Sequence, residues 1–313
     1  MEKSSKIYVA GHTGLVGSAI IRELKRQGYY NLCIVSHKEL DLRNQKDTED
    51  FFEREKPEYV FLAAAVVGGV LINDMLPGKF LYDNLAISMN VIHTAYKFGI
   101  KKLLYMGSGC VYPKLTDQPI REESLLTGDL EKTNEAYAVA KIAGIKMCEY
   151  YNKQYGMNFI SCMPCNAYGP GDNFDLNSSH VVPALIRKAH EAKMQNADSI
   201  VMWGTGNPVR EFIYIDDIAN ACVFLMNHYI GNTCINIGTG TEFTIRDLTE
   251  IVCDVVGFQG TIVNDLTKPD GSPRKLLDSS KIFTLGWRPS VNFSEGIQRT
   301  YQDFLEHEEQ YLN

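Results

Sequence analysis

The chain has 313 residues, about twice the length of a common domain, and should therefore form one large α/β unit or two intertwined domains. Its residues are 45% apolar and 22% charged, a globular composition that excludes disordered, collagenous and membrane-embedded classes. The formal net charge of −7 argues against a broad surface for nucleic acid or phospholipid. A small molecule is the expected partner.

The apolar segments are too short to place the chain in a membrane. The longest runs from Tyr59 to Ile72, is broken by Gly68 and Gly69, and falls short of the ~20 residues that span a bilayer. Residues 1–6 are polar and lack the apolar stretch of a signal peptide. We therefore expect a cytoplasmic protein with no membrane partner.

The eight cysteines are spread along the chain, which favours reduced thiols over a disulfide scaffold. Cys162 and Cys165 form a CxxC pair, the spacing of a redox dithiol or of half a zinc site. No second CxxC or close pair of histidines accompanies them, and Pro164 lies inside an apolar stretch that is typical of a strand. We expect a packing role for both cysteines and no metal ion.

Apolar periodicity alternates between strands and helices through the first half of the chain. The apolar strands are continuous rather than alternating, which indicates a parallel sheet that is covered on both faces. The fold expected is therefore α/β, a doubly wound parallel sheet of at least five strands. Its strands are expected at 7–10, 32–35, 59–65, 102–106 and 159–163, and its helices at 15–28, 48–55, 81–98 and 136–155.

Beyond Tyr168 the elements become shorter and less regular. Residues 169–173 form a polar loop and 181–192 an amphipathic helix, whereas 212–226 and 234–237 are expected to return to the sheet. This pattern predicts two interleaved units. Residues 1–168 and 211–240 would form a dinucleotide-binding domain, and residues 169–210 and 241–313 a smaller α/β substrate-binding domain.

Three glycines, Gly11, Gly14 and Gly17, follow the first strand and open the first helix. In this position a glycine-rich turn brings backbone N–H groups and a helix N-terminus to the pyrophosphate of a dinucleotide. The second strand ends at Ser36, His37 and Lys38 rather than at a carboxylate, which would hold a ribose diol. Hydroxyl and basic groups suit a 2′-phosphate, so NADPH is the expected cofactor.

Tyr137 and Lys141 lie four residues apart, so on a helix they share one face. A nearby ammonium group lowers the pKa of a phenol and would bias Tyr137 toward acid–base work. Ser108 lies at the end of the preceding strand, where its hydroxyl can hold a substrate carbonyl. Together these side chains form a set suited to hydride transfer to a ketone.

The residues described so far resemble the extended short-chain dehydrogenase/reductase family over nearly the whole chain. The segments 107–114, 134–144 and 172–184 are more specifically similar to the GDP-L-fucose synthases of that family. Those enzymes epimerise C3 and C5 of GDP-4-keto-6-deoxy-D-mannose and then reduce C4. The resemblance implies an NADPH-dependent nucleotide-sugar epimerase/reductase with a Rossmann domain.

The resemblance also implies the catalytic roles. Tyr137 would donate a proton, Lys141 would orient the nicotinamide ribose, and Cys110 and His180 would exchange the C3 and C5 protons. The dehydratases of the family carry an Asp-Glu pair where this chain has Gly109 and Cys110, so dehydration is not expected. The 4-epimerases are not expected to carry Cys110 together with His180. The GDP-L-fucose synthases commonly have Ser at the position of Gly109, and the missing hydroxyl could weaken proton transfer.

Further contacts follow from the same resemblance. Substrate-binding residues would be Lys188, Trp203, Arg210 and Asp270, with Lys188 standing where the family often has Arg. The implied cofactor contacts are Gly11, His12, Thr13, Gly14, Leu15, Val16, Gly17, Ser36, His37, Lys38, Asp41, Leu42, Ala64, Ala65, Met106, Gly107, Lys141, Pro164, Asn166, Ala167 and His180.

Two other functions remain open at this point. One is a C4 reductase, with little or no epimerisation, that acts on a related GDP-6-deoxy-4-keto sugar such as a heptose. The other is a redox-sensing protein that binds NADPH and regulates a partner, although a sensor would need no general acid. Relatives usually form homodimers through two helices, which would be 81–98 and 136–155 here.

Overall fold

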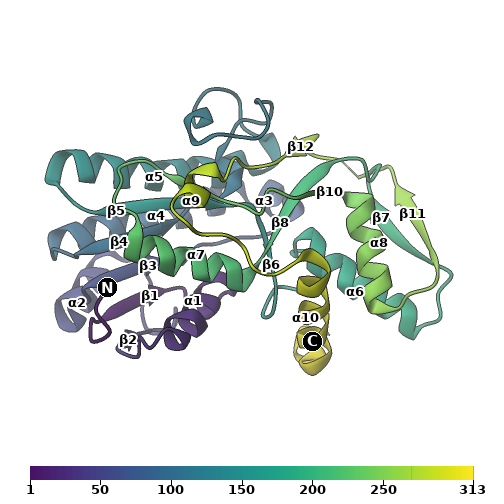
Figure 1. The fold of residues 1–313 in the computed structure, drawn as a ribbon, viewed down its shortest axis with the longest axis horizontal. Helices are drawn as coiled ribbons and strands as arrows, with labels where there is room; N and C mark the ends of the chain where they lie inside the picture. Colours follow the sequence, from purple (N-terminus) through teal and green to yellow (C-terminus); the bar gives the residue numbers. More distant parts are fainter. Residues whose placement is uncertain (269, 313) are drawn as a thin grey trace.

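The computed structural model describes residues 1–268 and 270–312. Its main sheet has six parallel strands in the order β2-β1-β3-β4-β5-β9 (Figure 1). The strands are β1 (Ile7–Ala10), β2 (Leu32–Cys33), β3 (Tyr59–Leu62), β4 (Lys102–Met106), β5 (Phe159–Pro164) and β9 (Ile235–Ile237). The predicted doubly wound parallel sheet is confirmed.

Both faces of this sheet are buried. Ile7 and Val9 of β1 belong to one apolar cluster, whereas the intervening Tyr8 and Ala10 belong to another. Because successive side chains of a strand point to opposite faces, these two clusters are the two faces of the sheet. Helices α1 (Leu15–Arg26) and α7 (Ile215–His228) cover the first face, and α2 (Gln45–Glu55), α4 (Pro77–Lys97) and α5 (Glu135–Tyr155) cover the second.

Most predicted elements are confirmed, with shifts at their ends. Strands 7–10 and 102–106 agree residue for residue, whereas β2 has only two residues. Helix α4 starts four residues earlier than predicted, at Pro77, because proline is compatible with the first turn of a helix. A short helix, α3 (Val70–Met75), precedes it.

A second, smaller unit lies beside the main sheet (Figure 1). It contains one sheet in which β8 (Val209–Tyr214) pairs with β10 (Glu242–Thr244), β12 (Arg274–Lys275) and β6 (Asn166–Tyr168). A separate pair joins β7 (Ser199–Trp203) and β11 (Thr261–Asp265). Its helices α6 (Val181–Met194), α8 (Ile245–Val256) and α10 (Phe293–Glu306) share a third apolar cluster, and α11 (Glu308–Leu312) follows them.

The predicted division of the chain differs from the structure in two places. Residues 212–214 do not join the main sheet but belong to β8 of the second sheet, and only α7 and β9 return to the first unit. Conversely, Ile282 of α9 (Ser280–Thr284) and Trp287 pack in the same cluster as β1. No polar linker marks either place where the chain passes between the units, because buried apolar residues such as Ile213 and Ile282 pack with the main sheet.

The two units meet at the carboxyl end of β5. This strand ends at Pro164 in the main sheet, and β6 begins at Asn166 in the second sheet, so the chain crosses between the units within two residues. In open α/β sheets, ligands bind outside the carboxyl ends of the strands. The fold therefore places the candidate site at this junction.

Candidate active site

The turn between β1 and α1 leaves no room for a Cβ atom at Gly11 or Gly17. Gly11 has φ +83°, and a Cβ there would lie 2.7 Å from the Cα of Ala64. A Cβ on Gly17 would lie 2.0 Å from the carbonyl oxygen of Gly11. Helix α1 begins after Gly14 without a side-chain cap, so its first N–H groups are left for an anion. These features fit the pyrophosphate of a dinucleotide.

Side chains of the loop after β2 form a hydrogen bond and ion pairs that the sequence did not predict. Ser36 Oγ donates a 2.6 Å hydrogen bond to the Glu39 carboxylate. Arg43, which the sequence analysis missed, pairs with Asp41 at 2.7 Å and with Asp83 at 3.1 Å. The hydrogen bonds from Arg43 lower the pKa of Asp41 to about 2. The sequence offered one signal for Arg43, which is its position two residues after Asp41, a predicted cofactor contact.

Ser108 and Tyr137 come together just beyond β4. Ser108 caps the short 3₁₀ turn η1 (Gly109–Val111), accepting a 3.3 Å hydrogen bond from the Cys110 N–H. Tyr137, in the first turn of α5, lies close enough to Ser108 for the two hydroxyls to interact. Burial raises the pKa of Tyr137, Cys110 adds to this effect, and the Ser108 hydroxyl opposes it. Both hydroxyls are therefore in place to hold one carbonyl oxygen.

Lys141 lies one turn further along α5 and faces the same region. Its Nζ donates a 2.8 Å hydrogen bond to the carbonyl oxygen of Met106 and lies 5.8 Å from the ring centre of Tyr137. Burial lowers the pKa of Lys141 to about 8. The predicted lowering of the Tyr137 pKa is not seen in this structure, because loss of water around the phenol raises that pKa.

Cys110 is half-buried in the same cluster. Asn134, the last residue of η3 (Lys132–Asn134), places its Nδ2 3.3 Å from Cys110 Sγ. The Cys110 thiol also interacts electrostatically with the Arg210 guanidinium of β8 and with Tyr137. The structure thus brings together four predicted residues from three separate parts of the chain, Ser108, Cys110, Tyr137 and Arg210.

His180 stands at the N-cap of α6 and makes no capping hydrogen bond. It is exposed to solvent, yet burial among surrounding atoms lowers its pKa. The preceding segment is held by a 2.9 Å bond from the Gly69 N–H to the Ser178 carbonyl.

The predicted substrate residues occupy the second unit. Trp203, at the end of β7, has the Lys188 ammonium 5.0 Å and the Lys268 ammonium 5.2 Å from its ring centre. Lys268 was not found from the sequence, where it stands as an isolated base in a loop. The Asp270 carboxylate accepts hydrogen bonds from the N–H and hydroxyl of Thr205, at 2.8 and 2.9 Å. Asp270 therefore anchors the turn that follows Trp203.

Glu211, next to Arg210 on β8, ties the two units together. Its carboxylate accepts bonds from the N–H groups of Thr239 and Gly240, both at 2.7 Å, and of Leu277 at 3.0 Å. Its carbonyl oxygen accepts a 2.7 Å bond from Asn166 Nδ2. These bonds hold Arg210 and Asn166 in position at the junction.

The two cysteines of the CxxC pair are free. Cys162 is buried in β5, and Cys165 lies close enough to Glu211 for burial and that carboxylate to raise its pKa. Over residues 1–268 and 270–312, no cluster of His, Cys, Asp or Glu side chains has the arrangement of a metal site. Across the same described residues, no helix is long and apolar enough to cross a bilayer.

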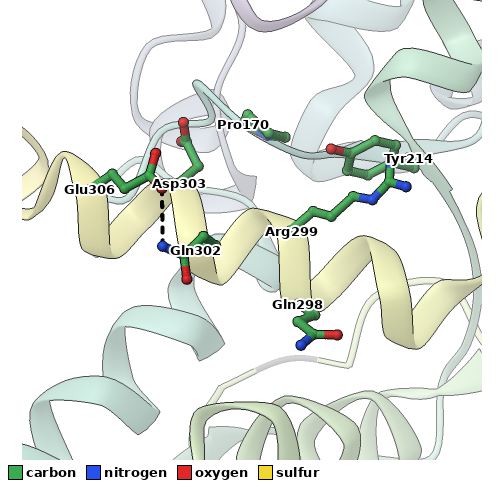
Figure 2. A pocket seen from close by; sticks show the side chains of 7 residues that line it. All are labelled: Pro170, Tyr214, Gln298, Arg299, Gln302, Asp303 and Glu306. Carbon is green, nitrogen blue, oxygen red and sulfur yellow. Dashed lines mark hydrogen bonds between the residues drawn. The ribbon is translucent and has the colours of Figure 1, made fainter.

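A separate surface hollow of about 470 Å³ lies along α10 (Figure 2). Its lining includes Arg299 and Asp303 of the helix and Tyr214 at the end of β8. None of the predicted site residues lines this hollow, so it is distinct from the cluster around Cys110.

A glycine cradle for a dinucleotide next to a serine, a tyrosine and a lysine defines a dinucleotide-dependent oxidoreductase of the Rossmann class. Residues 7–238 match the NAD dependent epimerase/dehydratase family. The chain belongs to this family.

Individual relatives agree with this assignment. The chain is 57% identical to GDP-L-fucose synthase 1 of Arabidopsis thaliana over 304 residues, or 97% of this chain and 94% of the relative. A solved GDP-L-fucose synthetase from Naegleria fowleri, bound to NADP, superposes with a TM-score of 0.92 at 31% identity, covering 100% and 96% of the two chains. A GDP-6-OMe-4-keto-L-xylo-heptose reductase from C. jejuni also superposes with a TM-score of 0.92, at 38% identity over 98% and 99%.

Proposed function

We propose that this protein converts GDP-4-keto-6-deoxy-D-mannose to GDP-L-fucose with NADPH, by epimerising C3 and C5 and reducing C4. The observation that carries the proposal is the grouping of Ser108, Tyr137 and Cys110, because it joins a carbonyl-holding pair to a proton-transfer group. The high identity to GDP-L-fucose synthases supports the same substrate.

In the epimerisations, Cys110 as thiolate removes the proton from a carbon beside the C4 ketone. The electrons of that C–H bond form the enolate C=C, and the carbonyl pair moves to oxygen, where Ser108 and Tyr137 donate hydrogen bonds. His180 returns a proton on the opposite face, after which water restores both groups. The lowered pKa of His180 makes its protonated ring a better acid.

In the reduction, the glycine turn would hold NADPH, which when bound would supply a hydride to C4. Tyr137 donates its phenolic proton to the C4 oxygen while Ser108 holds that oxygen. Lys141 orients the nicotinamide ribose and stabilises the tyrosinate that forms, because its ammonium group lies on the same face of α5. The turn at Gly11, Gly14 and Gly17 would hold the pyrophosphate, and the remaining cofactor contacts are those that the resemblance implies.

The GDP moiety belongs with the second unit in this proposal. Arg210 and Lys188 would neutralise the diphosphate, and Trp203 offers a partly exposed indole face to the nucleotide or sugar. Asp270 acts by holding the adjacent turn.

A second candidate is a C4 reductase of a GDP-linked 4-keto heptose, with little or no epimerisation. It is favoured by one residue, Gly109, which provides no hydroxyl next to Cys110. The likeness to the C. jejuni heptose reductase supports the same reading.

We further propose a cytoplasmic homodimer. Helices α4 and α5 pack together and leave large apolar side chains exposed, including Tyr82 at 68% and Met89 at 52% on α4 and Tyr150 at 59% on α5. Exposed apolar groups gathered on neighbouring helices mark an interaction surface. A second copy of the chain would bury them.

The deciding experiment incubates the purified protein with NADPH and GDP-4-keto-6-deoxy-D-mannose in deuterated water. Cofactor oxidation with deuterium at both C3 and C5 of the product is the expected result. Oxidation without deuterium would favour the plain C4 reductase, and no oxidation would reject the assigned substrate.

A further inference from the structure

Asn134 occupies a helix N-cap position without capping the helix. It stands at the N-cap of α5, where asparagine normally accepts a bond from the first helical N–H groups, yet its side chain makes no capping bond. Nδ2 instead points to Cys110 Sγ at 3.3 Å. The amide is therefore directed at the thiol at the expense of the helix end.

The other end of the same amide has no partner. Asn134 Oδ1 is buried and accepts no hydrogen bond in the described structure. A buried acceptor without a donor destabilises the folded protein, so this oxygen is open to a donor from a ligand or from an ordered water. The free oxygen lies on the same side chain that contacts Cys110, within the cluster of Ser108 and Tyr137.

Two polar groups face the Cys110 sulfur. Asn134 contributes an N–H donor from the start of α5, and Arg210 contributes a positive charge from β8. Both stabilise sulfur when it is negatively charged. Tyr137 faces the thiol from α5 and remains a neutral phenol, because burial raises its pKa. Glu131 and Asp270 interact with Arg210 and moderate its charge.

We propose that Asn134 is the positioning residue of the epimerisation steps: its amide N–H holds and activates the Cys110 thiolate, and its free Oδ1 accepts a hydrogen bond from a hydroxyl of the bound sugar. Through these two bonds one side chain fixes the carbon that loses its proton beside the sulfur. The second half of this proposal rests on the proposed function, whereas the first half does not.

The first test measures alkylation of Cys110 by iodoacetamide against pH in the cofactor-free protein, with peptide mass spectrometry to identify the modified thiol. Asn134→Ala should slow the reaction near neutrality about tenfold, because the sulfur loses its N–H donor. Asn134→Asp should slow it further, because a carboxylate repels the thiolate. A profile that superposes on that of the original protein would overturn the activating role.

Two further variants separate this effect from helix capping. Asn44→Ala removes an asparagine that does cap a helix, since its side chain accepts a bond from the Asp47 N–H, and should leave the Cys110 profile unchanged. Asn134→Ser restores a capping group without an amide and should still shift the profile. If Asn134→Ala does not fold, Asn134→Ser provides the same test of the amide.

The second test compares deuterium incorporation at C3 and C5 with the initial rate of NADP⁺ reduction by GDP-L-fucose, which is the reverse of the C4 step. Asn134→Ala should lower incorporation at least tenfold more than it lowers the reverse rate. Equal losses would reject the contact with the sugar hydroxyl. If the original protein incorporates no deuterium, the proposed function fails, and the alkylation profile still decides the relationship between Asn134 and Cys110.

Discussion

The ammonium group of Lys141 donates a 2.8 Å hydrogen bond to the carbonyl oxygen of Met106, so a buried cation lies 5.8 Å from the ring centre of Tyr137. Burial lowers the pKa of Lys141 to about 8, well below the ~10.4 of an exposed lysine. The folded chain therefore binds this proton less tightly than the unfolded chain does, and the charged form costs stability at neutral pH.

Lys141→Met should abolish reduction and raise the free energy of unfolding at pH 7 by on the order of 2 kcal/mol, because the buried charge disappears. The stability advantage should shrink as pH rises from about 8 toward 10, where the original folded chain sheds its proton before the unfolded chain does. Urea unfolding across this pH range checks the prediction. A constant difference between the two proteins would contradict the buried-cation explanation.

Tyr137→Phe should lower the rate of C4 reduction by about 10²–10⁴-fold, since it removes the general acid while keeping the ring. NADPH binding, measured by fluorescence titration, should be unchanged because the glycine turn is untouched. Retained turnover would reject the catalytic role. A regulatory, non-enzymatic protein would lose nothing with this substitution.

Gly109→Ser should fold and should raise deuterium incorporation at C3 and C5 relative to C4 reduction. A Cβ at Gly109 would lie 3.4 Å from the Pro164 carbonyl oxygen, an ordinary contact. Gly107→Ser is the matched control, because its Cβ would lie only 2.9 Å from the Cys162 carbonyl oxygen and should destabilise the fold. An unchanged ratio of exchange to reduction would show that this hydroxyl is not limiting.

Asp172→Asn should stabilise the protein by about 2–4 kcal/mol at pH 8 and by little at pH 4. Asp172 is buried, its Oδ2 has no partner, and burial raises its pKa to about 7. The folded chain binds this proton more tightly than the unfolded chain, so stability is lost as pH rises from about 4 through 7. Asp74→Asn, at an exposed position of α3, should change nothing. An equal gain in the free energy of unfolding at pH 4 and pH 8 would contradict a raised pKa for Asp172.

Met89→Glu combined with Tyr82→Glu should convert the proposed dimer to a monomer, because a charge buried between two apolar helix faces is unfavourable. Light scattering after size-exclusion chromatography measures the mass. Ile230→Glu, at an 88% exposed position outside α4 and α5, is the control and should leave the mass unchanged. A dimer that survives the double substitution would place the interface elsewhere.

Local sequence determined much of this protein. The strand at 7–10, the glycine turn after it and the strand at 102–106 follow from residue order, because a buried parallel strand needs a continuous apolar run and a tight βα turn needs glycine. The spacing of Tyr137 and Lys141 likewise places them on one helical face before any tertiary contact is known.

Tertiary structure decided what residue order does not encode. The assignment of β8 to the second sheet depends on strand pairing with β6, β10 and β12, which are distant in sequence. The contact of Asn134 with Cys110 and the pairing of Arg43 with Asp83 likewise join separate segments. The pKa of Tyr137 was decided by burial rather than by its neighbour at i+4, because desolvation depends on everything that packs around a group and periodicity reports only its own helix.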